Sequence, residues 1–330
     1  MQAKLHKRED LIYLSLLLIK LVVKPHALDE TDIAILRILF RDCRTSYRSI
    51  GLSVKLSTNA VKARVKRLLS SGVIQDFSTM VNPAAFGEAK LCHLIIKDSK
   101  KTLEEEETMN CLKLLGEPVM KLDCIDGISV IVVAAARGQE QEEHDKIQLL
   151  SEALKPVIVQ DCFVSHSHYP AQNLRETDFK IVKCLIFNPR MDISEIARRI
   201  SVSSKTVSSK LEKMKENNIL HFIVKTGSAS MQGYIRFVMV IRIERKGSQK
   251  SIRQIQEELD KSFLIAFPIT IEEDITTWQL VAQNIFEIDS VLKKIELLEG
   301  VTEAHSYIPS RMEFYRDWMV REIANKVSVA

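Results

Sequence analysis

The 330-residue sequence lacks the patterns that mark several large classes of protein. Its six cysteines show no CxxC spacing, which predicts reduced thiols in a cytoplasmic protein. Glycine is scarce, with ten residues, and no phosphate-binding glycine loop occurs. No nucleophile–base pair or pair of carboxylates stands out, so the sequence predicts neither an enzyme nor a bound cofactor.

Long hydrophobic runs are also missing. The apolar run Leu11–Val23 has 13 residues and contains Lys20, whereas a membrane-spanning helix needs about 20 residues. Its length suits a signal sequence, but no small-x-small cleavage site follows it. We expect residues 1–27 to form an apolar extension that packs on another protein surface, with no membrane contact. A membrane anchor and an extension of little function are the alternatives.

What the sequence does contain is a self-match at a fixed offset of 146 residues. Leu28-Asp-Glu-Thr-Asp32 aligns with Leu174-Arg-Glu-Thr-Asp178, and Leu56-Ser57 aligns with Val202-Ser203, without a gap. A match at constant spacing predicts two structural units of the same build. Basic charge is concentrated in them: residues 28–75 carry a net charge of +5 and residues 174–221 a net charge of +4, against +4 for the whole chain.

The most informative segment of each unit is a predicted amphipathic helix. In residues 57–69, Ser57 is a good N-cap, and Val61, Val65 and Leu68 form one buried stripe. Residues 203–216 repeat this pattern, with Ser203 as N-cap and Val207, Leu211 and Met214 as the stripe. Each helix therefore packs on one side and presents polar or basic residues on the other, as a helix in a DNA major groove must.

The order of the predicted elements gives the fold class. Three helices are followed by a strand at Val73–Val81, which we expect to form a short wing. This order indicates a winged helix-turn-helix. A β-α-β-β-α-β order follows between residues 90 and 166, which is ferredoxin-like. We therefore expect an α+β chain of two tandem units, each a winged helix-turn-helix followed by a ferredoxin-like domain. The expected segments are residues 1–27 (extension), 28–84 and 170–230 (winged helices), 85–169 and 231–311 (ferredoxin-like domains), and 312–330 (C-terminal helix, from Met312).

These motifs resemble the Lrp/AsnC (leucine-responsive) family of transcription regulators. The matching residues are Leu28-Asp-Glu-Thr-Asp-Ile33, the spacing Val61-x-x-Arg64-Val65-x-x-Leu68-x-x-x-Gly72-Val73-Ile74, and Val81-Asn82-Pro83. The second unit keeps Leu174-x-Glu-Thr-Asp178 but has Asn218 in place of the glycine. An ordinary member has one unit and dimerises. This chain carries two, so it is similar to a dimer fused head to tail.

The resemblance implies a sequence-specific regulator whose partner is double-stranded DNA and which forms homo-oligomers. It also implies a small-molecule effector, such as an amino acid, at the turn between the second and third strands of the ferredoxin-like domain. The candidate positions are Asp126, Gly127 and Trp278. Neither Asp123–Ser129 nor Glu272–Trp278 keeps the Thr-Gly-x-x-Asp-like motif of members that bind amino acids.

The predicted DNA contacts lie on the two amphipathic helices. Asn59 can pair with adenine, Lys62 and Lys66 can reach guanine or a phosphate, and the remaining arginines suit phosphate. In the second helix Glu212 stands where Lys66 stands and repels phosphate, so a structural role is the alternative there. The full set of candidates is Ser57, Thr58, Asn59, Lys62, Ala63, Arg64, Lys66, Arg67, Ser203, Ser204, Lys205, Ser208, Ser209 and Lys210.

Other functions compete with this hypothesis. Cys162, His166 and His168 would share one face of an extended strand and are the best metal candidates, although a metal-free strand end is the favoured interpretation. A ligand-sensing or interaction protein that keeps its winged helices for packing is the main alternative. An enzyme similar to the siroheme decarboxylases is a further one, but neither Lys121–Ala135 nor Pro268–Gln283 contains the histidine that their motifs place there.

Overall fold

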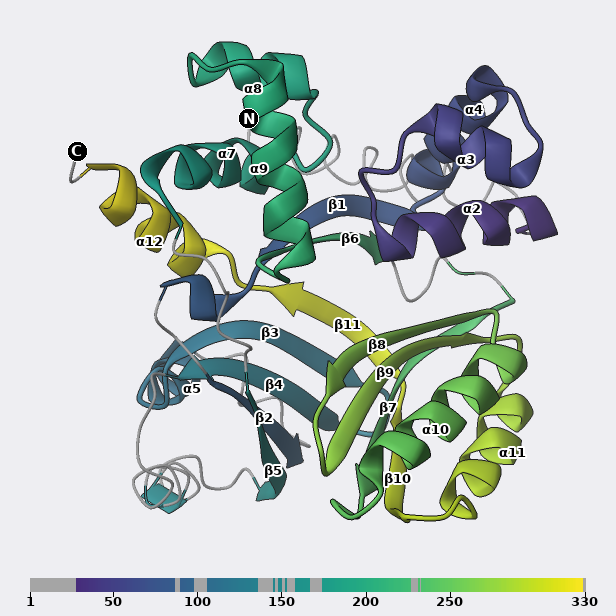
Figure 1. Cartoon of the computed structure of the whole chain (residues 1–330). Helices are drawn as coiled ribbons and strands as arrows, with labels where there is room; N and C mark the ends of the chain where they lie inside the picture. Colours follow the sequence, from purple (N-terminus) through teal and green to yellow (C-terminus); the bar gives the residue numbers. More distant parts are fainter. Residues whose placement is uncertain are drawn as a thin grey trace, which may run out of the picture.

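The computed structural model describes residues 28–86, 90–97, 106–135, 158–166, 174–226 and 233–328, together with a few isolated positions. The predicted N-terminal extension (1–27) lies outside these residues, and so does most of the segment 136–157, where the second helix of the first β-α-β-β-α-β order is expected. Within them the chain is α+β, as predicted, and its two winged-helix units stand on one side of two antiparallel sheets (Figure 1).

Each unit opens with three helices and a strand. The first contains α2 (Glu30–Arg41), α3 (Tyr47–Val54), α4 (Thr58–Ser70) and β1 (Ile74–Val81). The second contains α7 (Glu176–Phe187), α8 (Ile193–Arg199), α9 (Ser204–Glu216) and β6 (Leu220–Thr226). Asn218 (φ 54°) has the left-handed conformation that Gly72 (φ 76°) has in the first unit. Asparagine is one of the few other residues that adopts this conformation readily, so the replacement preserves the chain reversal.

Strand β1 is not a wing within its own unit, because it pairs antiparallel with β6 of the other unit in a two-stranded sheet. Phe77 lies opposite Val224, and Ser78 lies opposite Ile223. Adding the repeat offset of 146 to one pair generates the other, so a local twofold axis passes between them. The sequence predicted the strand at β1 and a second winged helix-turn-helix, but it did not locate β6 and contained no signal that strands of the two units pair.

The two ferredoxin-like sheets have the same strand order. The first domain has the strands β2 (Lys90–Lys97), β3 (Glu117–Cys124), β4 (Ile128–Ala135) and β5 (Ile158–His166), in the spatial order β3-β4-β2-β5, and the helix α5 (Glu106–Leu112). The second contains β7 (Ile235–Ile243), β8 (Ile265–Ile271), β9 (Ile275–Ala282), β10 (Val301–Tyr307) and helices α10 (Ser248–Ser262) and α11 (Ile285–Glu296). Their facing sides share an apolar cluster that includes Ile95, Leu122, Val238 and Tyr307.

The C-terminal segment contacts both units. Strand β11 (Pro309–Phe314) pairs with the edge strand β3 of the first sheet, and α12 (Asp317–Ser328) packs on α7. The prediction that a helix starts at Met312 is therefore wrong, because Met312 lies in β11 opposite Leu122. The open edge of β3 offers unpaired backbone groups, and pairing with them outweighs local helix propensity over these residues.

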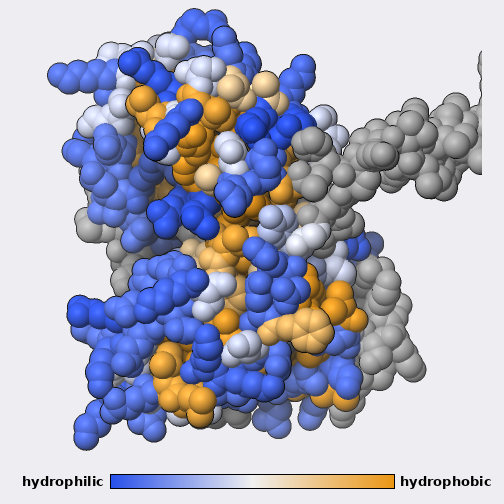
Figure 2. All heavy atoms as spheres, turned by 90° about the vertical axis from the view of Figure 1, so that its right-hand side faces the viewer, coloured by the Kyte–Doolittle hydropathy of each residue, from blue (hydrophilic) through white to orange (hydrophobic). Residues whose placement is uncertain are grey.

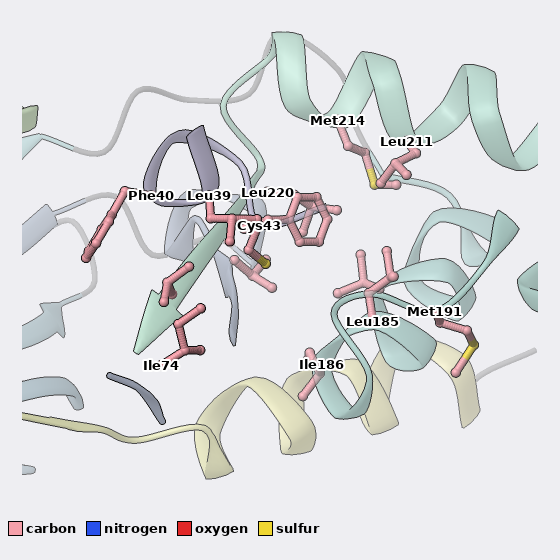
Figure 3. Packing of buried hydrophobic residues seen from close by; sticks show 14 of the residues in the cluster. Leu39, Phe40, Cys43, Ile74, Leu185, Ile186, Met191, Leu211, Met214 and Leu220 are labelled. Carbon is pink, nitrogen blue, oxygen red and sulfur yellow. The ribbon is translucent and has the colours of Figure 1, made fainter. Parts of the chain in front are cut away.

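One hydrophobic core joins both winged helices. It contains Leu39 and Cys43 from the first unit, and Leu185, Met214 and Leu220 from the second (Figure 3). Trp318 of α12 is buried against it, edge-on to Phe86 at 5.6 Å between ring centroids. The winged helices are therefore one packed body rather than two independent domains.

Candidate nucleic-acid interface

The turn between α3 and α4 is repeated between α8 and α9. Lys55 (φ 56°) and Ser201 (φ 58°), which are related by the offset of 146, both have the left-handed conformation at the turn. The hydroxyl of Ser57 accepts a hydrogen bond from the Ala60 backbone N–H at 3.2 Å, and that of Ser203 accepts one from Thr206 at 3.0 Å. Both predicted N-caps are confirmed, and they determine where α4 and α9 begin.

Helices α4 and α9 each bury the predicted apolar stripe. Val61, Val65 and Leu68 are at most 1% exposed. Val207, Leu211 and Met214 are buried as well. The opposite faces are open to solvent. The exposed candidates are Ser57, Thr58, Asn59, Lys62, Ala63 and Lys66 on the first unit, and Ser203, Ser204, Lys205, Ser208 and Ser209 on the second. They line one side of each helix, so both helices can present these side chains to the groove of a nucleic acid.

Arg64 and Arg67 are held differently from the exposed lysines. The Arg64 guanidinium lies 2.7 Å from the Asp29 carboxylate and 2.9 Å from that of Asp32, and Arg67 lies 2.7 Å from Asp32. Asp32 has no exposed surface, so both arginines neutralise a buried carboxylate at the start of α2. Their predicted phosphate contacts remain predictions, and such contacts would have to share the guanidinium with these acids.

The electrostatics of this cluster follow from the same contacts. Burial acts to raise the pKa of Asp29, but hydrogen bonds from Arg64 and from the Asp32 backbone, with the charges of Arg64 and Arg67, lower it overall. The hydrogen bonds to Asp29 and Asp32 raise the pKa of Arg64. In the second unit Lys210 makes the matching ion pair with Asp178 at 2.8 Å. Lys210 is thus also tied to the first helix of its own unit.

The exposed lysines Lys62 and Lys66 differ from Arg64 and Arg67 in their contacts. Across the described part of the chain, Lys62 and Lys66 make no hydrogen bond or ion pair. A cation without an internal partner remains fully hydrated, and all of its N–H donors are available to a phosphate or a base edge. These two side chains are therefore the strongest candidates for DNA contact on α4.

Sequence reasoning missed two arginines that connect the units. Arg44 donates to the Pro189 carbonyl and, at 2.9 Å, to that of Met191. Arg190 donates to the Cys43 carbonyl and, at 3.2 Å, to that of Thr45. Arg44 and Arg190 are 146 residues apart, so the repeat offset contained the signal. Their contacts are reciprocal about the local twofold axis, as expected of a dimer interface with equivalent patches.

The remaining predicted residues do not come together. Asp126 and Gly127 form the tight β3–β4 turn, as predicted, with the Asp126 carboxylate accepting from the Ile128 N–H at 3.1 Å. Trp278 lies in the middle of β9 and is 1% exposed, inside the core covered by α10 and α11. The expectation that it stands beside a turn is therefore wrong, because β9 already begins at Ile275, and strand alternation points Trp278 at the helices.

The metal candidates are not assembled either, so far as the structure describes them. No group of three or more histidine, cysteine or acidic side chains able to hold a metal occurs among the described residues. Cys162 packs on the apolar cluster under the first sheet together with Val164. The His166 side chain and all of His168 lie outside the described residues.

Known proteins provide the comparison that decides the family. The AsnC-type helix-turn-helix profile matches residues 28–69, and a winged helix-turn-helix DNA-binding profile matches residues 174–220. The transcriptional regulator Ptr1 of Methanocaldococcus jannaschii is 34% identical over 141 residues, which cover 42% of this chain and 90% of Ptr1. LrpA of Mycobacterium tuberculosis is 32% identical over 123 residues, covering 34% of this chain and 77% of LrpA. The chain belongs to the Lrp/AsnC family.

As an Lrp/AsnC protein, this chain is a DNA-binding transcription regulator with two helix-turn-helix domains. Among solved structures, the siroheme decarboxylase NirDL covers 91% of this chain and 99% of its own, with a TM-score of 0.47 and 15% identity. That likeness is too weak to carry a functional argument. None of the helices in the described residues has the length and apolarity needed to cross a membrane.

Proposed function

We propose that this Lrp/AsnC regulator acts as a dimer fused into one chain, and that α4 and α9 enter two major grooves on one face of DNA. The grooves would be successive, about 34 Å apart, as for the two recognition helices of a dimeric helix-turn-helix protein. Phosphate contacts would provide most of the affinity, and base contacts would set the register.

The observation that carries this proposal is the twofold relation between the two winged helices. The β1–β6 ladder and the reciprocal contacts of Arg44 and Arg190 obey the same offset of 146 residues. A buried hydrogen bond from the Thr79 hydroxyl to the Leu185 carbonyl at 2.7 Å adds to the connection. A rigid connection of this kind reduces the entropic cost of placing two helices on one duplex, because their spacing is already set.

Binding to genomic DNA tests the proposal directly. Purified protein is incubated with a pool of genomic fragments at two salt concentrations, and the retained fragments are sequenced. We expect a motif with two half-sites separated by one or two helical turns. Retention without a motif would indicate that the protein reads only the backbone. No retention at physiological salt would contradict the proposal and favour the ligand-sensing alternative.

A paired substitution tests the role of α4. Lys62→Ala plus Lys66→Ala should weaken binding to a retained fragment. It should also reduce the slope of log K against log salt by about one to two, since each of the two lysines that contacts a phosphate contributes about 0.9. The control is Lys246→Ala plus Lys293→Ala, which removes two exposed lysines from the second ferredoxin-like domain. An equal slope in both double variants would contradict a DNA contact by α4.

The minimal DNA-binding species in this proposal is one chain. Further self-association, through the sheets or the N-terminal segment, remains a prediction, which light scattering of the full chain across a concentration series would test. A fused dimer that binds one operator as a single chain should give a stoichiometry of one chain per duplex. Two chains per duplex at every concentration would contradict that minimal unit.

A small-molecule effector also remains a proposal, now confined to the β3–β4 turn. Asp126 is exposed there, and the adjacent Ile125 is 67% exposed. The turn lies against the second unit, since the Ile125 N–H donates to the Ile308 carbonyl at 3.1 Å. An amino acid bound there would touch both units. Thermal unfolding with each of the twenty amino acids would reveal binding, and Asp126→Ala should abolish any shift that is found.

A further inference from the structure

The two helix-turn-helix units have the same frame but different exposed charges. From α3 to the end of α4, four positions that are exposed and basic have no basic residue at the matching, equally exposed position of the second unit. The matched pairs are Arg48 and Ser194, Lys55 and Ser201, Lys62 and Ser208, and Lys66 and Glu212. Two of these pairs, Lys62 with Ser208 and Lys66 with Glu212, lie on α4 and α9, so the exposed faces of these two helices differ in charge.

The basic residues of the second unit lie elsewhere. Arg198 and Arg199 stand at the end of α8, where the first unit has Leu52 and Ser53. Lys205, at the start of α9, matches Asn59. The recognition helices α4 and α9 thus each carry four basic residues, but α9 also carries Glu212 and Glu216 and has no cation at the positions of Lys62 and Lys66. The helix before α9 gains two arginines, and in a helix-turn-helix this helix crosses the DNA backbone.

The frame beneath these surfaces is the same in both units. The N-caps, the left-handed turn residues and the buried stripes all match at the offset of 146. The ion pair between Arg64 and Asp32 has its counterpart in Lys210 and Asp178. Because the backbones match, α4 and α9 would meet a duplex in the same pose, and only their exposed side chains would distinguish one half-site from the other.

Those side chains select different bases. Lys62 and Lys66 are donors, and the guanine O6 and N7 atoms are the acceptors that they meet in the major groove. Glu212 has only acceptor oxygens, and the N4 amino group of cytosine is the donor that a carboxylate pairs with there. A carboxylate at this position also repels phosphate, so a base donor is the DNA group that it would pair with.

We propose that the chain recognises an asymmetric operator in one orientation. The half-site under α4 contains guanine opposite Lys62 or Lys66, and the half-site under α9 contains cytosine opposite Glu212. This inference rests on the proposed function, in which both helices enter major grooves. A symmetric dimer of identical units reads a palindrome, whereas this fused pair has two different readers at a fixed spacing.

Selection from a pool of random-sequence duplexes tests the inference separately from the proposed function. The expected result is one motif with two different half-sites. A palindromic motif would overturn the asymmetry and leave the proposed function intact. A motif with one half-site only would show that α9 reads no sequence, which also overturns the inference. No motif at all would contradict the proposed function itself.

Converting α9 to the α4 pattern sharpens the test. Ser208→Lys plus Glu212→Lys should bind a palindrome of the α4 half-site at least about tenfold more tightly than the unaltered chain does, given the usual discrimination of one or two good base contacts. It should lose its preference for the asymmetric operator. Glu257→Lys, which changes an exposed carboxylate of α10, controls for non-specific attraction to DNA. Equal gains in both variants, or no gain on the palindrome by a normally folded double variant, would overturn the inference.

Discussion

Replacing Arg190 provides a stringent test of the connection between the two winged helices. Its guanidinium donates to the carbonyls of Cys43 and Thr45, and lies over the rings of Tyr47 at 4.5 Å and Phe77 at 5.2 Å. All four partners belong to the first unit. Arg190→Ala therefore removes contacts between units without touching the core of either helix-turn-helix.

The size of the effect follows from those contacts. A hydrogen bond from a charged donor contributes about 1.5–3 kcal/mol, and a partly exposed cation–π contact contributes about 0.5–1 kcal/mol. Water can replace part of what the two carbonyls lose, and such contributions do not add fully. We expect Arg190→Ala to lower the free energy of unfolding by about 2–4 kcal/mol. Arg190→Lys should lose about half as much, since one ammonium cannot span both carbonyls in the geometry of the fork.

Urea unfolding followed by circular dichroism measures this change. The matched control is Arg199→Ala. Arg199 lies nine residues after Arg190 in the same unit, and the substitution breaks its exposed ion pair with Glu195. Exposed pairs of this kind contribute about 0.3–0.5 kcal/mol. We expect Arg190→Ala also to weaken binding to a two-half-site operator. Losses of similar size for Arg190→Ala and Arg199→Ala would refute the reasoning about the interface.

Three further predictions concern stability. Trp318→Ala should lower the free energy of unfolding by about 3–5 kcal/mol in urea titrations, because Trp318 is buried against Phe86. Burial lowers the pKa of His93 to about 4; since the unfolded chain then binds more protons, stability should fall by about 3 kcal/mol as the pH decreases from 6.5 to 4, and His93→Gln should remove that part of the pH dependence. Asn218→Ala should cost about 1 kcal/mol and Asn218→Gly almost nothing, since φ is positive there.

Surface composition is relevant to the alternatives that compete with DNA binding. Figure 2 shows the side formed by the first winged helix and by α10 and α11, where hydrophilic residues predominate and hydrophobic residues appear in patches. Leu52, Phe286 and Leu297 are exposed by 77%, 80% and 85%. Scattered exposed apolar residues are normal in soluble domains, so these patches do not by themselves favour an interaction protein over a DNA-binding one.

Much of the fold was predictable because local patterns determined it. The buried stripe of Val61, Val65 and Leu68, with Ser57 before it, indicates a helix wherever it occurs in a chain. The Asp126-Gly127 pair predicts its hairpin for the same reason. The repeat offset of 146 residues supplied the architecture, because two segments with the same pattern of apolar residues fold in the same way.

What the sequence by itself determined, therefore, is the elements of each unit, their order and the family. Tertiary structure alone decided the partners: β1 pairs with β6, β11 extends the sheet of the other unit, and Arg44 and Arg190 each donate to backbone carbonyls of the other unit. Tertiary packing also decided the place of Trp278, because α10 and α11 cover the face of β9 on which it lies. Backbone hydrogen bonds are the same for every residue type, so the choice between strand partners depends on which edges the packed units bring together, and no local pattern encodes that.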